Sequence, residues 1–214
     1  MRKIWRIPLN CIGRVVSEGI LVLARFCYGF EVRGCENLPN IGPLIVLIKV
    51  SGRVGVVLAA FFWSVLGRFY GLGGGPLIIN SPFFSFVSRS LGVLPTFKGK
   101  SLSAVPLMTA YNLIRSGEIV FVTVAAELPW DGRLQPLRPG AAWLALRAHV
   151  PIVIAAVEGD YTIWPRWAWR PHLTGKLILT IGKPLDLANT PHQRITKEML
   201  ESANRRLLKE LDCL

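Results

Sequence analysis

Acidic residues and histidines are scarce in this sequence. Its 214 residues include 13 Asp and Glu and three His, against 25 Lys and Arg, so the formal net charge is +12. The three histidines are His149, His172 and His192, and we expect them to be structural or solvated rather than catalytic. The excess of cations favours an anionic partner, which we expect to be a membrane surface before nucleic acid.

The sequence also lacks an apolar run long enough to form a membrane-spanning helix. The best candidate, residues 54–67, lies between Arg53 and Arg68 and is shorter than the roughly 20 residues that a bilayer requires. Residues 69–88 are uncharged, but their glycines and prolines would break a helix exposed to lipid. Since 51% of the chain is apolar and the mean hydropathy is +0.42, a disordered protein is nevertheless excluded.

The four cysteines form no C-x-x-C pair and have no metal-ligand spacing. We therefore interpret them as reduced packing residues, and we expect no metal and no cofactor. Arg14 and Glu18 interrupt the apolar core that a signal peptide needs, so the N-terminus is expected to be retained. The predicted location is the cytoplasmic face of a membrane, with peripheral attachment.

Residues 1–27 predict a basic amphipathic helix, which precedes one α/β domain at residues 28–214. At helical spacing one stripe is apolar and the opposite stripe is polar. The apolar stripe is Trp5, Leu9, Ile12, Val16, Ile20 and Leu23, and the polar stripe is Lys3, Arg6, Asn10, Arg14 and Ser17. Such a helix either lies in the membrane interface, with Trp5 and Arg6 among its contacts, or packs on its own domain.

The rest of the chain alternates between strand-like and helix-like runs. The strand-like runs are residues 28–33, 43–48, 91–96, 118–124, 151–157 and 177–181, and the helix-like runs are 54–67, 101–116 and 139–148. Thr190-Pro191 predicts the start of a final helix that docks through residues such as Leu207 and Leu211. The alternation predicts an α/β fold with a mixed sheet of about six or seven strands, flanked by helices.

Four stretches of the sequence carry a resemblance to a known family. They are VRGCENLPNIGPLIVL at 32–47, DGRL at 131–134, RPGAAWLALRA at 138–148 and VPIV at 150–153. Over about residues 30–185 the chain resembles the glycerolipid acyltransferases, the family of the 1-acylglycerol-3-phosphate acyltransferases. The resemblance implies a single-domain acyltransferase fold. It also implies an acceptor lysophospholipid, with acyl-CoA or acyl-carrier protein as co-substrate.

The reactive positions of that family are empty in this chain. In the family a His, four further residues and an Asp follow a strand, and the His takes the proton of the acceptor hydroxyl. The His position is Val50 here, the Asp position is Gly55, and the Glu position of a later block is Ala125. None of these side chains titrates, so the resemblance predicts a pseudoenzyme, natural or deliberately disabled, that at most binds phospholipid or acyl donor.

Several polar residues stay as candidates for binding a phosphate or substrate. They are Lys49, Ser51, Arg53, Lys98, Gly99 and Glu127. Lys98 stands where the family usually has a phosphate-binding arginine, and it is otherwise a solvated loop lysine. Lys49, Ser51 and Arg53 lie at the expected start of a helix, where free backbone N–H groups suit an anion, or they are solvent-facing loop residues.

Residues 163–171, IWPRWAWRP, interleave tryptophan with arginine. Tryptophan and arginine together are typical of a membrane interface, so Trp164, Arg166, Trp167 and Trp169 are candidates for membrane contact. The alternative is a loop whose tryptophans cap the sheet. Stacking on single-stranded nucleic acid ranks third.

Two other functions are left open by the sequence. One is an active acyltransferase that recruits Glu127, Ser51 or Lys98 in place of the missing groups. The other is a basic nucleic-acid-binding module, which the high apolar content and the lack of a recognisable binding motif disfavour.

Overall fold

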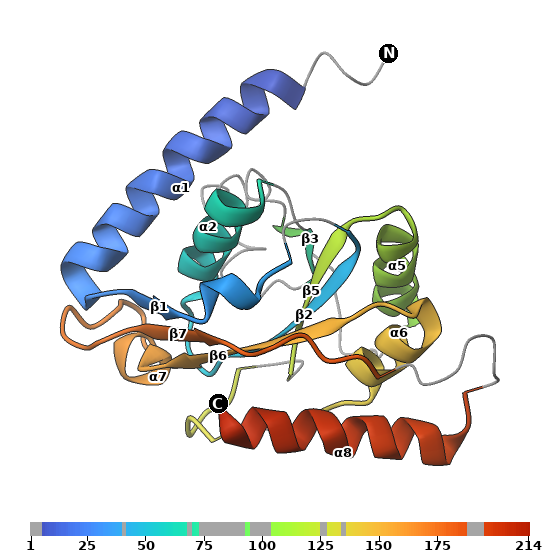
Figure 1. Ribbon diagram of the computed structural model, residues 1–214. Helices are drawn as coiled ribbons and strands as arrows, with labels where there is room; N and C mark the ends of the chain where they lie inside the picture. The colour runs from blue at the N-terminus through green and yellow to red at the C-terminus, as the bar shows by residue number, and fades with distance from the viewer. Residues whose placement is uncertain are drawn as a thin grey trace.

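The computed structural model describes residues 6–39, 42–67, 70–72, 93–94, 104–124, 128–133, 136–187 and 195–214. The described helices are α1 (Arg6–Tyr28), α2 (Gly55–Leu66), α5 (Ala104–Arg115), α6 (Gly140–Ala148), α7 (Asp160–Ile163) and α8 (Lys197–Cys213), with a 3-10 turn η1 (Cys35–Asn37). The strands are β1 (Glu31–Arg33), β2 (Leu44–Lys49), β3 (Tyr70–Leu72), β4 (Val93–Leu94), β5 (Ile119–Thr123), β6 (Ile152–Glu158) and β7 (Ile178–Ile181). Figure 1 shows the sheet with helices packed on it.

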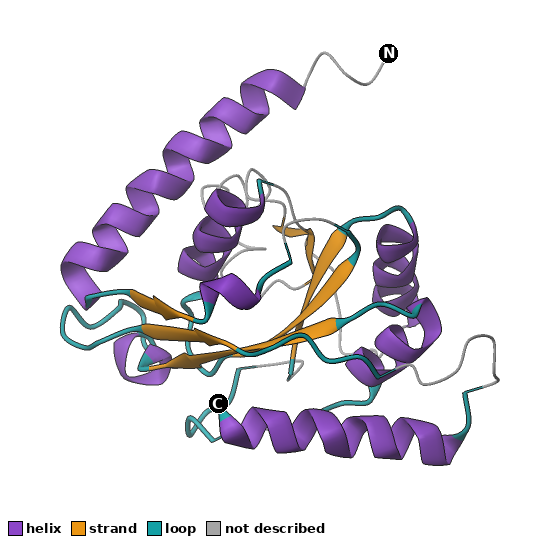
Figure 2. Cartoon of the chain, in the orientation of Figure 1, coloured by secondary structure: helices purple, strands orange, loops and turns teal. Residues whose placement is uncertain are grey.

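The seven strands form one mixed sheet in the order β1-β7-β6-β2-β5-β3-β4. Figure 2 shows the strands in orange between the helices. Neighbouring strands are parallel except β6 and β7, which are antiparallel. This confirms the predicted α/β fold with a mixed sheet of six or seven strands. The strand that the sequence pattern missed is β3, because its three residues are too few to show an alternation.

Strand β2 is buried on both faces and builds two cores. Leu44, Val46 and Ile48 belong to a first cluster, which also contains residues of α1 and α2. Ile45 and Leu47 point the other way, into a second cluster with residues of α5, α6 and α8. Successive side chains of a strand point to opposite faces, and both faces are covered here, so the strand is apolar throughout.

Helix α1 packs against α2, and its buried face differs from the predicted stripe. A side chain at Gly13 would start 2.9 Å from the Trp63 ring, so the two helices approach closely there. Ser17, which we expected on the polar face, is fully buried, and its hydroxyl donates to the Arg14 carbonyl. Leu23, which we expected on the apolar face, is 62% exposed. The prediction is wrong at these two positions because the buried face is centred on Gly13, Ser17, Leu21 and Ala24, with Val16 and Ile20 of the predicted stripe packed beside it.

Helix α8 begins later than predicted. Thr196 is its N-cap, and the Thr196 hydroxyl accepts the backbone N–H of Met199 at 3.3 Å. The predicted start at Thr190-Pro191 is therefore wrong, and those two residues lie outside the described part of the chain. Leu207 and Leu211 are fully buried in the second core, as the predicted docking requires.

Candidate functional site

The loop between β2 and α2 lies at the carboxyl end of the central parallel strands. β2 ends at Lys49, and α2 begins at Gly55. The neighbours of β2 in the sheet are β5 and β6, and both run parallel to it. Open α/β sheets bind their ligands beyond the carboxyl ends of such strands, so this loop is the candidate site.

The residues at the two ends of this loop, Val50 and Gly55, provide no titratable group. Val50 directly follows β2, is partly buried, and packs against the first core. Gly55 is exposed at the start of α2, and a Cβ added there would meet no heavy atom within 4 Å. Position 55 therefore has room for a carboxylate that the chain does not supply.

The loop is held in place by a buried carboxylate, Asp160, which the sequence did not single out. Asp160 is 3% exposed. Its Oδ2 accepts the backbone N–H groups of Ser51 at 2.5 Å and Gly52 at 2.7 Å, and its Oδ1 accepts the N–H of Tyr161 at 2.8 Å. Asp160 follows β6, and the pairing of β6 with β2 brings Asp160 to this loop. In the sequence, the only sign of this role was the position of Asp160 just after a predicted strand.

Burial raises the pKa of Asp160, because an ionised carboxylate is poorly solvated there. The hydrogen bonds from the N–H groups of Gly52, Ser51 and Tyr161 act in the opposite direction, since they favour the charged form. Together these contacts engage both oxygens of the carboxylate. Asp160 therefore shapes the loop, and its oxygens are directed at the backbone.

The predicted anion site on free backbone N–H groups needs a correction. The N–H groups of Ser51 and Gly52 donate to Asp160, and the N–H of Arg53 donates to the Trp164 carbonyl at 2.7 Å. The Arg53 guanidinium also donates to the Ala168 carbonyl at 3.3 Å. These three N–H groups already have protein acceptors, so only the side chains of Lys49, Ser51 and Arg53 stay as candidates for binding an anion.

Other predicted site residues lie outside the described part of the chain. They are Trp5, Lys98, Gly99, Ala125 and Glu127. Arg6 is the first residue of α1, and its side chain also lies outside the description. Their predicted roles stay predictions.

The tryptophan-rich segment divides into one packed and two exposed indoles. Trp164 is partly buried against the first core, and its indole N–H donates to the Ala168 carbonyl at 3.2 Å. This packing favours the alternative of a tryptophan that caps the sheet, and membrane contact by Trp164 stays a prediction. Trp167 is 60% exposed and Trp169 is 83% exposed. A further exposed indole, Trp130, comes from another loop and was missed, because neighbours in space need not be neighbours in sequence.

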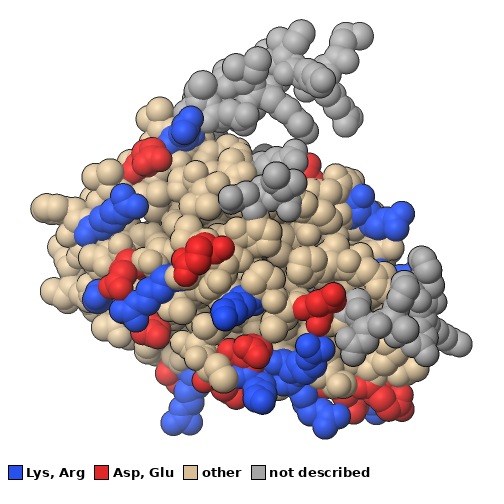
Figure 3. All heavy atoms as spheres, viewed as in Figure 1, with Lys and Arg blue, Asp and Glu red and all other residues tan. Residues whose placement is uncertain are grey.

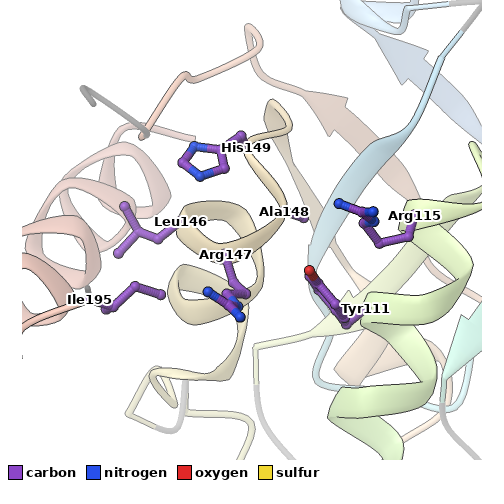
Figure 4. A pocket seen from close by; sticks show the side chains of 7 residues that line it. All are labelled: Tyr111, Arg115, Leu146, Arg147, Ala148, His149 and Ile195. Atoms are coloured by element: carbon purple, nitrogen blue, oxygen red, sulfur yellow. The ribbon is translucent and has the colours of Figure 1, made fainter. Parts of the chain in front are cut away.

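Figure 4 shows a separate pocket of about 230 Å³. It is lined by Tyr111, Arg115, Leu146, Arg147, Ala148, His149 and Ile195. Helices α5 and α6 end at this pocket, before β5 and β6 begin, so it lies at the amino ends of the strands. It is therefore not part of the β2–α2 site. No cluster of three or more potential metal ligands occurs within the described ranges.

Comparison with known proteins identifies the fold. No protein-family model matches the chain. It is 26% identical, over 159 residues, to the chloroplastic 1-acyl-sn-glycerol-3-phosphate acyltransferase BAT2 of Brassica napus. The matched residues make up 74% of this chain and 45% of the plant protein. The crystal structure of the 1-acyl-sn-glycerophosphate (LPA) acyltransferase PlsC from Thermotoga maritima superposes with a TM-score of 0.70 at 17% identity, covering 98% of this chain and 82% of that one. The resemblance to the glycerolipid acyltransferase family is confirmed.

Within this acyltransferase fold, the β2–α2 loop lies where the family has its His and Asp. By the alignment of motifs, the family's His and Asp would stand at Val50 and Gly55. The strand, the loop and the helix that would carry them are all present. The chain spans less than half the length of the plant acyltransferase that it matches.

Proposed function

We propose that this chain is a catalytically disabled protein of the lysophosphatidic acid acyltransferase type, which binds phospholipid or an acyl donor at the cytoplasmic face of a membrane. The observation that carries the proposal is the β2–α2 loop, in which Val50 and Gly55 replace the imidazole and the carboxylate. General-base catalysis needs a group of matched pKa within hydrogen-bond reach of the acceptor hydroxyl. Neither residue provides one.

The size of the loss supports an inactive protein over a slow one. Removing a positioned acid or base costs about 10²–10⁴-fold in rate, and residues that act as one unit lose most of their effect together. Binding and oxyanion contacts together leave an acceleration of about 10³–10⁴ over water in enzymes stripped of their catalytic residues. Trace turnover is therefore compatible with the proposal, whereas ordinary enzymatic rates are not.

Binding at a membrane surface is supported by the exposed side chains of α1. Val15, Val22, Leu23 and Phe26 are 62–88% exposed on a helix that also carries exposed Arg14 and Arg25. Apolar and cationic side chains together suit the interface of an anionic bilayer. No helix within the described ranges is long and apolar enough to cross one. On the face drawn in Figure 3, basic and acidic side chains are interspersed, so that face offers no continuous basic stripe for nucleic acid.

A direct assay tests the proposal. The full chain is incubated with lysophosphatidic acid and either acyl-CoA or acyl-carrier protein, and product is measured by mass spectrometry. Binding to anionic vesicles is measured in parallel by flotation. Vesicle binding without product is the expected result. Turnover at ordinary enzymatic rates would exclude a disabled protein, and absence of vesicle binding would remove the membrane part.

Asp160 favours a second candidate function, an active acyltransferase with displaced groups. It is a carboxylate bonded to the loop itself, and Ser51, Lys98 and Glu127 are the other groups that such a mechanism could recruit. This function requires turnover in the parent chain that Asp160→Asn or Glu127→Ala abolishes in a folded protein. Turnover that neither substitution changes would remove both carboxylates as candidates.

A further inference from the structure

Exposed aromatic side chains from two loops gather beside the β2–α2 site. One loop contributes Trp130, which is 63% exposed. Residues 161–173 contribute Trp167, Trp169 and Leu173, which are 60%, 83% and 77% exposed. We call these residues, with Tyr161 and Arg166, the tryptophan platform. Several large apolar side chains exposed in neighbouring segments indicate an interaction surface rather than incidental exposure.

Contacts of Tyr161 and Arg166 order the part of the platform around Trp130 and Trp167, and they leave these two indoles exposed. The Tyr161 hydroxyl donates to the Trp130 carbonyl at 2.6 Å and accepts the indole N–H of Trp167 at 3.4 Å. The Arg166 guanidinium lies 4.6 Å from the centre of the Trp130 ring and donates to the Leu128 carbonyl at 2.9 Å. The two loops are thus joined to each other. A surface that is already ordered loses less conformational entropy when it binds a partner.

The platform is also joined to the β2–α2 loop. Arg53 donates its backbone N–H to the carbonyl of Trp164 and its guanidinium to that of Ala168, inside the segment that carries the exposed tryptophans. Asp160, which holds Ser51 and Gly52, directly precedes Tyr161. Whatever binds the platform therefore lies next to the carboxyl end of β2.

The charges around the platform select an anionic partner. Among the described residues of the two loops, Arg133, Arg166 and Arg170 are cationic, and the one exposed acidic residue, Asp131, pairs with Arg133 at 3.7 Å. Indole rings prefer the headgroup level of a bilayer, where the ring is in an apolar medium and the N–H is hydrated. Arginines beside them attract anionic lipid.

We propose that the tryptophan platform docks on an anionic phospholipid bilayer and seats the β2–α2 edge of the sheet at the headgroups. The proposal rests on the proposed function, because it names the surface through which that site meets phospholipid. It goes further by assigning docking to residues outside α1, with Trp130 and Tyr161 among them and Trp164 excluded.

Vesicle sedimentation with substituted full-length protein tests this assignment. Trp167→Ala with Trp169→Ala is expected to weaken partitioning into vesicles of phosphatidylcholine and phosphatidylglycerol by at least about tenfold, since each indole buries a large area. Arg170→Gln is expected to weaken it about fivefold, and only when phosphatidylglycerol is present. Matched controls are Met108→Ala and Arg206→Gln, exposed residues of α5 and α8 that should leave partitioning unchanged.

Fluorescence provides an independent readout. Lipids brominated in the acyl chain quench indoles that enter the interface. We expect quenching in the parent, and a clear loss of the quenched fraction in Trp167→Phe with Trp169→Phe, which keeps the surface apolar. Circular dichroism and thermal melting establish that each variant is folded.

The outcomes separate the two levels of the proposal. If the parent binds vesicles but the tryptophan and arginine variants bind equally well, the platform is excluded while membrane binding through α1 stands. If the parent binds no vesicles, both the platform and the membrane part of the proposed function fail. If the parent instead binds an oligothymidylate, and Trp167→Ala with Trp169→Ala abolishes that binding, the platform is a nucleic-acid surface and the inference is overturned.

Discussion

The carboxylate of Asp160 accepts a hydrogen bond of 2.7 Å from the backbone N–H of Gly52. This contact joins the residue that follows β6 to the loop that follows β2. It fits tightly, because a Cβ on Gly52 would lie 2.1 Å from the Asp160 carbonyl oxygen. The loop at the candidate site therefore depends on a side chain far away in the sequence.

Removing the Asp160 carboxylate should destabilise the fold. Asp160→Ala leaves the N–H groups of Ser51 and Gly52 without their acceptor, which costs about 2–4 kcal/mol in the free energy of unfolding. Asp160→Asn keeps one carbonyl oxygen and should cost about half as much. Urea denaturation measures both, with Asp131→Asn as an exposed control. Equal stability of Asp160→Ala and the control would contradict the role of Asp160 in holding the β2–α2 loop.

The raised pKa of Asp160 gives the stability a specific pH dependence. A group whose pKa is higher in the folded state stabilises the fold fully below its unfolded value, about 3.9, and that contribution is lost as the pH rises through the folded pKa. The stability of the parent relative to Asp160→Asn should therefore fall as the pH rises from about 4. Urea titrations over a pH series measure this difference, and a rise instead would contradict the prediction.

Glu31 should behave in the opposite way and is the matched control for that experiment. Hydrogen bonds from Lys176 and Arg33 lower the pKa of Glu31 to about 2. Its contribution is present above the unfolded pKa and is lost as the pH falls toward 2. The stability of the parent relative to Glu31→Gln should thus decrease on acidification, in the same titrations.

Two glycines of the same loop region should respond differently to alanine. Gly52→Ala places a methyl group against the Asp160 backbone, so we expect a loss of about 2–3 kcal/mol or misfolding. Gly55→Ala meets open space at the first residue of α2, so stability should be unchanged or higher by up to about 1 kcal/mol. Thermal melts compare the pair. A tolerated Gly52→Ala would show that the close approach is not rigid.

Restoring the family residues should restore acyl transfer. Position 55 has room for a side chain, and an acidic residue in the first turn of a helix is favourable. Val50→His with Gly55→Asp and Ala125→Glu is expected to raise the transfer rate about 10²–10⁴-fold over the parent. The control is Val50→Gln with Gly55→Asn, which is polar but supplies no base. A folded triple variant without activity would contradict the motif alignment.

The tryptophans should differ in their effect on stability. Trp164→Ala removes a ring packed on the first core and a hydrogen bond to Ala168, and should cost about 3 kcal/mol. Trp167→Ala should cost less than about 1 kcal/mol, because that ring is exposed. Chemical denaturation separates the two. Equal losses would mean that Trp167 is part of the fold rather than of a binding surface.

Sequence patterns predicted most of the sheet, because burial on both faces requires the uninterrupted apolar run of β2. They failed at Ser17 and Leu23, since a helical period alone does not decide which face meets α2. They also missed the hydrogen bonds of Asp160 to the β2–α2 loop, because the contact with Ser51 joins residues 109 positions apart. That contact exists only because β6 pairs with β2.

The sequence by itself determined the alternation of strands and helices, because apolar periodicity is a property of the chain in one dimension, and its resemblance to the glycerolipid acyltransferases implied the fold and the empty positions Val50 and Gly55. Tertiary structure alone decided that Asp160 closes the loop, and that Trp130 joins Trp167 through Tyr161 while Trp164 turns to the core. The physical reason is strand pairing: it places the ends of distant segments at one edge of the sheet, and their hydrogen bonds and exposure follow from that placement.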